Sequence, residues 1–284
     1  MSSAENVMLR PTDELVHARP PGALDTWQEN CFVMGYDELS DLSVYFHVER
    51  LVDRVEIKAA AGRGDAITWA HANDDAWTDV VVPFEHLRLN WAGDQVGFDL
   101  ELRSEIPAID HAQALVKMAL PGAERDHYEA VGRLIGRVEI EGCSVDFDGL
   151  FWRDHTWGAR EYAKFGASWW WPTCLDGGHA YAGGVAVDLG DRVLGYGLVA
   201  DCDGVSGASD VRVEVKGDRS PGNYTAVNVE YEPAGRDPVR LAYTPRHHLC
   251  TTFPSFNVER QWNDAYSLCT WGDRRGYGSI ELGI

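Results

Sequence analysis

Short segments rich in β-branched and aromatic residues recur along almost the whole chain, separated by Gly, Asp or Asn. Only residues 109–120 form a run of helix-favouring residues long enough for a helix, which Pro121 and Gly122 would end. Many short strands and one short helix predict an all-β protein built from antiparallel barrels or sandwiches. The expected strands are 42–48, 52–59, 79–83, 87–91, 95–103, 131–140, 143–151, 166–172, 180–188, 192–199, 211–216, 226–231 and 239–243.

Turn residues indicate hairpins and a domain boundary. The segment 92–94 (Ala-Gly-Asp) can close one hairpin, and Glu141-Gly142 can close another. The series of strands pauses at the expected helix and the polar linker 121–126, and then restarts. We therefore expect two consecutive β domains, residues 1–122 and 123–284.

Size and charge limit the classes of partner. With 284 residues, of which 45% are hydrophobic, the chain can bury a sizeable core. Its formal net charge of −20 would repel phosphate backbones and anionic lipid headgroups, so we expect neither nucleic acid nor a membrane as a partner. Neither a signal peptide nor an apolar run long enough to span a bilayer occurs, which predicts a cytoplasmic protein.

Common cofactor and nucleophile motifs are absent from the sequence. The six cysteines are widely scattered, which predicts free thiols. No CxxC, HxxxH or HExxH spacing occurs, and neither a GxSxG elbow nor a phosphate-binding or dinucleotide-binding glycine motif is present. We therefore expect no metal and no cofactor. Association into a homodimer stays open.

One stretch concentrates charge and aromatic rings. Residues 151–160 read Phe-Trp-Arg-Asp-His-Thr-Trp-Gly-Ala-Arg, and three tryptophans follow at 169–171. Residues 145–149 alternate as a strand should, whereas the triplet Arg153, Asp154, His155 places charged groups where a sheet face is usually apolar. Such groups must be hydrogen-bonded internally or open to a cavity.

This stretch resembles the signature of the lipocalin-like carotenoid 1,2-hydratase (hydroxyneurosporene synthase) superfamily. The shared pattern is His-Tyr-Glu, a strand, Gly, a second strand, Arg-Asp-His-x-Trp-Gly-x-Arg, and a Trp-rich strand that ends in Asp-Gly. The resemblance covers mainly residues 125–190, and the C-terminal glycines also fit. In this chain the matching residues are His127, Tyr128, Glu129, Gly142, 153–160, 169–171, Asp176, Gly177, Gly276, Gly278 and Glu281.

The resemblance implies two consecutive lipocalin-like domains with an apolar cavity. Members of this superfamily are associated with hydration of isoprenoid double bonds, with cyclisation begun by protonation, and with pericyclic ring closure. We expect a cofactor-independent enzyme that protonates a C=C bond of a hydrophobic, isoprenoid-like molecule, followed by water addition or ring closure. A pericyclase acting on a polyketide-like substrate and a non-catalytic carrier of lipophiles are the alternatives.

Asp154 is the first candidate for the general acid, because burial beside tryptophans raises the pKa of a carboxyl group. Arg153 or Arg160 beside it would do the opposite and keep Asp154 ionised. His155 is the alternative proton donor. His127 and Glu129 are further catalytic candidates, because they share one face of the preceding strand and can reach the same cavity. The expected substrate-binding residues are Trp157, Trp169, Trp171, Trp152, Tyr128 and Tyr181.

Overall fold

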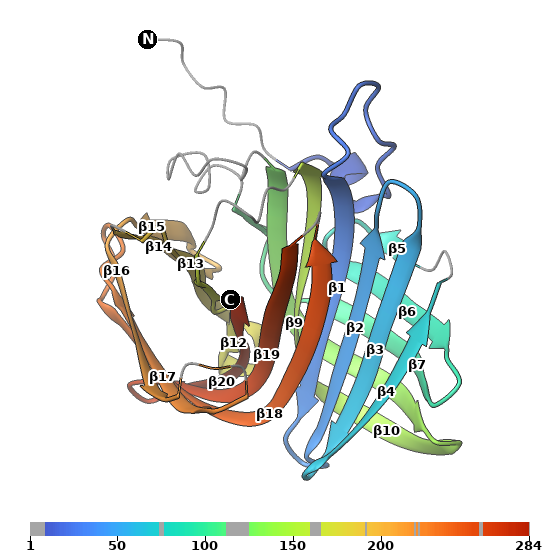
Figure 1. Ribbon diagram of the computed structural model, residues 1–284. Helices are drawn as coiled ribbons and strands as arrows, with labels where there is room; N and C mark the ends of the chain where they lie inside the picture. Colours follow the sequence, from blue (N-terminus) through green and yellow to red (C-terminus); the bar gives the residue numbers. More distant parts are fainter. Residues whose placement is uncertain are drawn as a thin grey trace.

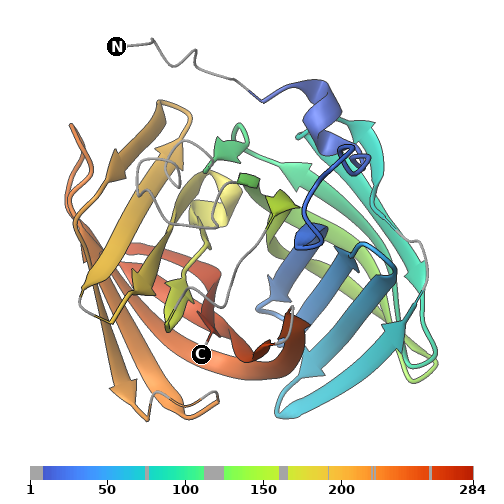
Figure 2. The same cartoon turned by 45° about the horizontal axis from the view of Figure 1, so that its top comes forward.

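The computed structural model describes residues 9–73, 77–111, 125–159, 166–190, 192–218, 220, 222–255 and 258–283. Most of them lie in strands of two large antiparallel sheets, and each sheet curls around its own interior (Figures 1 and 2). The all-β, lipocalin-like architecture predicted from the sequence is confirmed. No helix in the described ranges has the length and apolar character needed to span a bilayer.

The first sheet contains the strands up to residue 159. Its hydrogen-bonded order is β4-β3-β2-β1-β10-β9-β7-β6-β5, and β8 pairs with β9. Ile109 and Asp110, expected to begin a helix, form β8 instead, and 112–120 lie outside the described residues. The strands are β1 (Trp27–Asp37), β2 (Leu42–Arg50), β3 (Val55–Arg63), β4 (Ala66–Ala72), β5 (Asp79–Val82), β6 (His86–Ala92), β7 (Val96–Ser104), β8 (Ile109–Asp110), β9 (Arg125–Ile140) and β10 (Cys143–Ala159).

The second sheet contains the strands from residue 168 onwards. Its order is β15-β14-β13-β11-β20-β19-β18-β17-β16, and β12 pairs with both β13 and β20. The strands are β11 (Ser168–Trp170), β12 (Thr173–Leu175), β13 (Ala180–Asp188), β14 (Val193–Asp201), β15 (Gly204–Ala208), β16 (Val211–Gly217), β17 (Tyr224–Tyr231), β18 (Val239–Ser255), β19 (Val258–Trp271) and β20 (Arg274–Gly283). The described residues also contain two short 3-10 turns, η1 (Pro11–Glu14) and η3 (Asp176–Gly178).

The chain changes sheet between Ala159 and Ser168, which is later than the expected domain boundary at residue 122. The reason is the long hairpin of β9 and β10, which the sequence placed in the second half. In the structure β9 pairs with β7 and β10 pairs with β1, so this hairpin completes the first sheet. Its turn, Glu141-Gly142, has φ values of 50° and 80°, the left-handed pair typical of a two-residue hairpin loop.

Among the described residues, three large apolar cores and one small one, Val185 with Val187, hold the two sheets. One draws residues only from the first sheet, among them Val33 and Phe151, and a second draws only from the second sheet, among them Trp171. The third core lies between the sheets and contains residues of both, such as Trp152 and Tyr181. Successive strand residues point to opposite faces, so β10 contributes alternately to the first core and to the core between the sheets.

Candidate active site

The strand β10 runs without interruption through the charged triplet and separates its members by face. His155 pairs with Cys31 and Tyr128, whereas Asp154 pairs with Phe32 and Glu129. Arg153 and His155 therefore point into the first sheet, and Asp154 points towards the second sheet. Because Arg153 lies on the opposite face, it is not the ionic partner of Asp154. Arg160, the other expected partner, lies outside the described residues.

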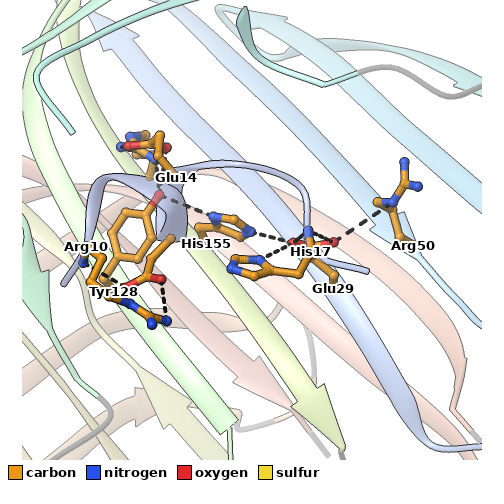
Figure 3. Close-up of polar contacts among 9 residues, drawn as sticks. Arg10, Glu14, His17, Glu29, Arg50, Tyr128 and His155 are labelled. Atoms are coloured by element: carbon orange, nitrogen blue, oxygen red, sulfur yellow. Dashed lines mark hydrogen bonds and ion pairs between the residues drawn. The ribbon is translucent and has the colours of Figure 1, made fainter. Parts of the chain in front are cut away.

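The face that points into the first sheet carries a network of polar side chains, shown in Figure 3 and called here the inner cluster. Its residues come from η1 and the segment after it, and from β1, β9 and β10. All but one of them are buried. The inner cluster consists of Glu14, His17, Glu29, Tyr128, Arg153 and His155.

One half of the inner cluster is built around Glu14. The Arg153 guanidinium donates to both of its carboxylate oxygens, at 3.0 and 2.8 Å, and the Tyr128 hydroxyl donates to Oε1 at 2.6 Å. The backbone N–H of Phe84 donates to Oε2 at 2.7 Å. A buried charge pair of this kind needs further hydrogen bonds, and both oxygens of Glu14 receive a second one, from Tyr128 and from Phe84.

The other half is built around Glu29, which is fully buried. Its Oε1 accepts from His155 Nε2 at 2.9 Å and from His17 Nδ1 at 2.8 Å, and the His17 backbone N–H also donates to it at 2.9 Å. Burial alone would raise the pKa of Glu29, but the hydrogen bonds from His155 and His17 outweigh burial and lower this pKa to about 2. Glu29 is therefore a carboxylate at neutral pH.

Tyr128 connects the two halves. Its hydroxyl lies 2.6 Å from Glu14 Oε1 and 3.2 Å from His155 Nδ1, so one proton has two neighbouring acceptors. Burial lowers the pKa of His155, an effect that its hydrogen bond to Glu29 only partly offsets. Burial also raises the pKa of Tyr128 well above its ordinary value. At neutral pH Glu29 is thus ionised, whereas His155 and Tyr128 are neutral.

The inner cluster reaches the surface at His17. The His17 side chain is 23% exposed, whereas those of Glu29 and His155 are at most 1% exposed. Its ring stacks on Trp157, with centroids 4.1 Å apart and planes at 14°. His17 lines an open cleft of about 370 Å³, and the other lining residues are Ala18, Arg19, Trp27, Arg50, Leu51, Val52, Asp53, Arg54 and Val55.

The opposite face of β9 and β10 carries a second polar group, called here the outer cluster: His111, His127, Glu129, Asp154 and Tyr181. Glu129 is central, with His111 Nε2 at 3.4 Å from one carboxylate oxygen and His127 Nε2 at 3.4 Å from the other. The Tyr181 hydroxyl, from the second sheet, donates to Glu129. Burial would raise the pKa of Glu129, but His111 and His127 lower it well below its usual range.

Asp154 lies at the edge of the outer cluster. Its Oδ2 is 3.5 Å from His127 Nε2 and accepts a hydrogen bond from the Thr156 hydroxyl at 3.1 Å. The Asp154 side chain is 19% exposed. The expected general acids therefore occupy two different environments, with Asp154 beside a histidine between the sheets and His155 beside a carboxylate inside the first sheet.

The aromatic residues expected to bind substrate also lie in different parts of the molecule. Trp157 and Tyr128 belong with the inner cluster, and Tyr181 belongs to the outer cluster. Trp152 packs against Phe32 between the sheets. Trp169 and Trp171 lie in the core of the second sheet. Trp170, which points the other way, has its ring 5.4 Å from that of His127.

Sequence reasoning missed Glu14, His17, Glu29 and His111. Glu14 and His17 precede the first strand, where no periodic pattern draws attention to them. Glu29 lies in β1, all of whose residues are buried, so the strand lacks the alternation that marks a half-exposed strand.

Within the described residues, each cluster brings two histidines and one glutamate within 4.8 Å of one another, a grouping that can also hold a metal ion.

Comparisons with known proteins agree with this fold. A crystal structure of a candidate AttH from Nitrosomonas europaea is 16% identical, with a TM-score of 0.70, and the match covers 94% of this chain and 98% of that one. Kievitone hydratase from Nectria haematococca is 11% identical, with a TM-score of 0.62, and the match covers 99% of this chain and 94% of that one. No curated protein sequence matches the chain.

These similarities support the lipocalin-like fold that the motif predicted, and they do not single out a carotenoid hydratase. A family model described as a domain of unknown function matches residues 10–283. Because this match spans nearly the whole sequence, the chain belongs to that family, DUF7064.

Proposed function

We propose that this protein is a hydratase-type enzyme that adds water to, or removes water from, a C=C bond of a hydrophobic small molecule. The observation that carries the proposal is the contact between His17 and Glu29. His17 Nδ1 lies 2.8 Å from Glu29 Oε1, and the same imidazole lines the cleft. A cleft of about 370 Å³ is in the range of small-molecule sites. The hydratase name of one similarly folded protein supports this class of reaction.

His17 can act as a general acid and base while the Glu29 carboxylate orients its imidazole ring. With Glu29 ionised, His17 donates its Nδ1 proton to the carboxylate, which leaves Nε2 to accept a proton from a water molecule in the cleft. The buried carboxylate then stabilises the imidazolium that forms, as in other carboxylate–histidine pairs. His155, Tyr128 and Glu14 hold Glu29 in place from the interior side.

Histidine acid–base chemistry favours a double bond conjugated to a carbonyl group. His17 removes a proton from water, the oxygen bonds to the β-carbon, and the electron pair of the double bond moves to form an enolate. The imidazolium then returns the proton to the α-carbon, so that one water is added overall. Arg50 lines the same cleft, with its Nε 4.0 Å from Glu29 Oε2, and can stabilise the enolate oxygen.

The test is isotope incorporation from water. The purified protein is incubated in ¹⁸O-labelled water with a panel of hydrophobic enones, and products are analysed by mass spectrometry. We expect incorporation of one labelled oxygen by the wild type and by a His71→Gln control, which changes an exposed histidine of β4. Both His17→Gln and Glu29→Gln should lower the rate by about 100-fold or more. Full activity in His17→Gln would overturn the assignment, and binding of enones without any turnover would indicate a carrier.

A second candidate function is favoured by Asp264. Burial raises the pKa of this carboxyl group to about 7, with Asp154 adding to the effect and Tyr45 and Lys58 opposing it. With a pKa of about 7, about half of these carboxyl groups carry a proton at neutral pH, and this form can protonate an unconjugated C=C bond. In that case a prenylated phenol should gain deuterium on carbon in D₂O, Asp264→Asn should abolish the reaction, and His17→Gln should leave it intact.

A further inference from the structure

We propose that the outer cluster is a binding site for a divalent transition-metal ion, with His111, His127 and Glu129 as ligands. All three side chains are at most 3% exposed. The two imidazole Nε2 atoms each lie 3.4 Å from a different carboxylate oxygen of Glu129. All three ligand atoms lie within 4.8 Å of one another. This site does not depend on the reaction proposed for the inner cluster.

The spacing fits metal ligands better than hydrogen bonds. An N–H···O hydrogen bond has its optimum at about 2.9–3.0 Å. Ligand atoms placed at about 2.0–2.1 Å from a tetrahedral zinc ion are separated by about 3.3–3.4 Å from one another. The distances of 3.4 Å from Glu129 to His111 and His127, and of 3.5 Å from His127 Nε2 to Asp154 Oδ2, match the second value.

The inner cluster provides the contrast within the same molecule. Three of its residues, His17, Glu29 and His155, form a group of the same composition, two histidines and one glutamate close together. There, His17 Nδ1 and His155 Nε2 approach the same oxygen, Glu29 Oε1, at 2.8 and 2.9 Å. These are hydrogen-bond lengths, and they leave no room for an ion between donor and acceptor. The distances therefore indicate that the inner cluster is held by hydrogen bonds, whereas the atoms of the outer cluster are spaced as ligands around a metal ion.

Charge balance supports the same assignment. Glu129 and Asp154 bring two carboxylates to one place between the sheets, where negative charge needs a positive counter-charge. A dication with two neutral imidazoles and two carboxylates gives a neutral site. Asp154, 3.5 Å from His127, stands where it can provide the fourth ligand or hold a bound water.

The surroundings hold the ligands in place before any ion binds. The Tyr181 hydroxyl donates to Glu129 and lies 3.2 Å from His111 Nε2. The backbone N–H of His111 donates to the His127 carbonyl oxygen at 2.8 Å, and the two rings stack with centroids 5.0 Å apart. A hydrogen bond from outside the site to a ligating carboxylate, as from Tyr181 to Glu129, orients the ligand and raises affinity. Nitrogen and oxygen donors without thiolate suit Zn²⁺, Fe²⁺ or Co²⁺.

The experiment measures metal binding by the full-length protein. After removal of metals with EDTA, the protein is titrated with Zn²⁺, bound metal is counted by elemental analysis, and thermal unfolding is recorded. We expect one tightly bound Zn²⁺ per chain and a higher melting temperature. His127→Gln and Glu129→Gln should lose the tight site, whereas His17→Gln, the matched change in the inner cluster, should retain it.

Two further measurements keep the result decisive if a ligand variant fails to fold. Co²⁺ added to the wild type should give the visible absorption of a four- or five-coordinate nitrogen and oxygen site. Tyr181→Phe keeps all ligands and should weaken binding by about 10-fold or more. No tight Zn²⁺ site in the wild type, or a site lost in His17→Gln and kept in His127→Gln, would overturn the proposal.

Discussion

At the scale of single residues, Glu29 decides the chemistry of the inner cluster. One of its oxygens accepts from both His17 and His155, so a single buried carboxylate organises a surface imidazole and a buried one. Sequence reasoning selected His155 from its motif, yet the carboxylate that orients it is more than a hundred residues away in the chain. Only the pairing of β1 with β10 brings the two together, and no local pattern encodes that pairing.

The lowered pKa of Glu29 predicts how stability depends on pH. The folded protein holds Glu29 ionised down to about pH 2, whereas in the unfolded chain its pKa returns to about 4.5. Its contribution, about 3 kcal/mol, is therefore complete above pH 4.5 and is lost as the pH falls towards 2. His155 acts in the same direction, because its lowered pKa makes protonation below about pH 6.5 unfavourable to folding.

Urea unfolding at a series of pH values checks this prediction. In Glu29→Gln, the slope of the unfolding free energy against pH should be smaller between pH 2 and 4.5 than in the wild type. Glu139→Gln, an exposed change in β9, should leave the slope unchanged. Equal slopes in the wild type and Glu29→Gln would contradict an ionised, hydrogen-bonded Glu29.

At the scale of elements, sequence patterns predicted most of the strands. They missed some strands, and they did not predict which strands pair. The hairpin of β9 and β10 was expected from Glu141-Gly142, and its left-handed turn confirms it. β1 was missed because Gln28, Glu29 and Asn30 are polar yet buried, a pattern that depends on the clusters around them. Residues of the two clusters could be found only in part, since strand alternation predicts which residues share a face and does not predict which strand lies opposite.

Two glycines of β9 and its turn should differ sharply on substitution by alanine. Gly142 has φ +80° and nothing within 4 Å of an added Cβ, so Gly142→Ala should cost only backbone strain, about 1–2 kcal/mol. Gly136 lies against β7, where an added Cβ would overlap the Asp99 carbonyl oxygen. Gly136→Ala should therefore lower the unfolding free energy more than Gly142→Ala does. Equal losses, measured by chemical denaturation, would mean that β7 and β9 are not packed this closely.

At the scale of the whole molecule, the core between the sheets makes each sheet dependent on the other. The Gly35 N–H donates to the Tyr266 hydroxyl at 3.2 Å, and Ser43 Oγ lies 2.9 Å from His247 Nδ1, so hydrogen bonds as well as apolar contacts cross the interface. Removing either sheet would expose the apolar side chains of this core on the other. We therefore expect the two sheets to unfold together.

Buried thiols offer a direct measurement of this coupling, because all six cysteines are free. Cys31 lies in the first sheet and Cys269 in the core of the second. Pulse labelling of thiols across a urea series, read by peptide mass spectrometry, should give the same midpoint for both. Labelling of one at clearly lower urea than the other would show that the sheets unfold independently.

The alternation of β10 has a consequence for the genetics of this protein. The odd-numbered positions 153, 155 and 157 face the inner cluster, where Trp157 stacks on His17. The even-numbered positions 154 and 156 face the outer cluster. A saturation mutagenesis scan across 153–157 should therefore separate into two interleaved phenotypic classes by parity. Suppressors of odd-position defects should arise in η1 and β1, and suppressors of even-position defects in β8 and β13.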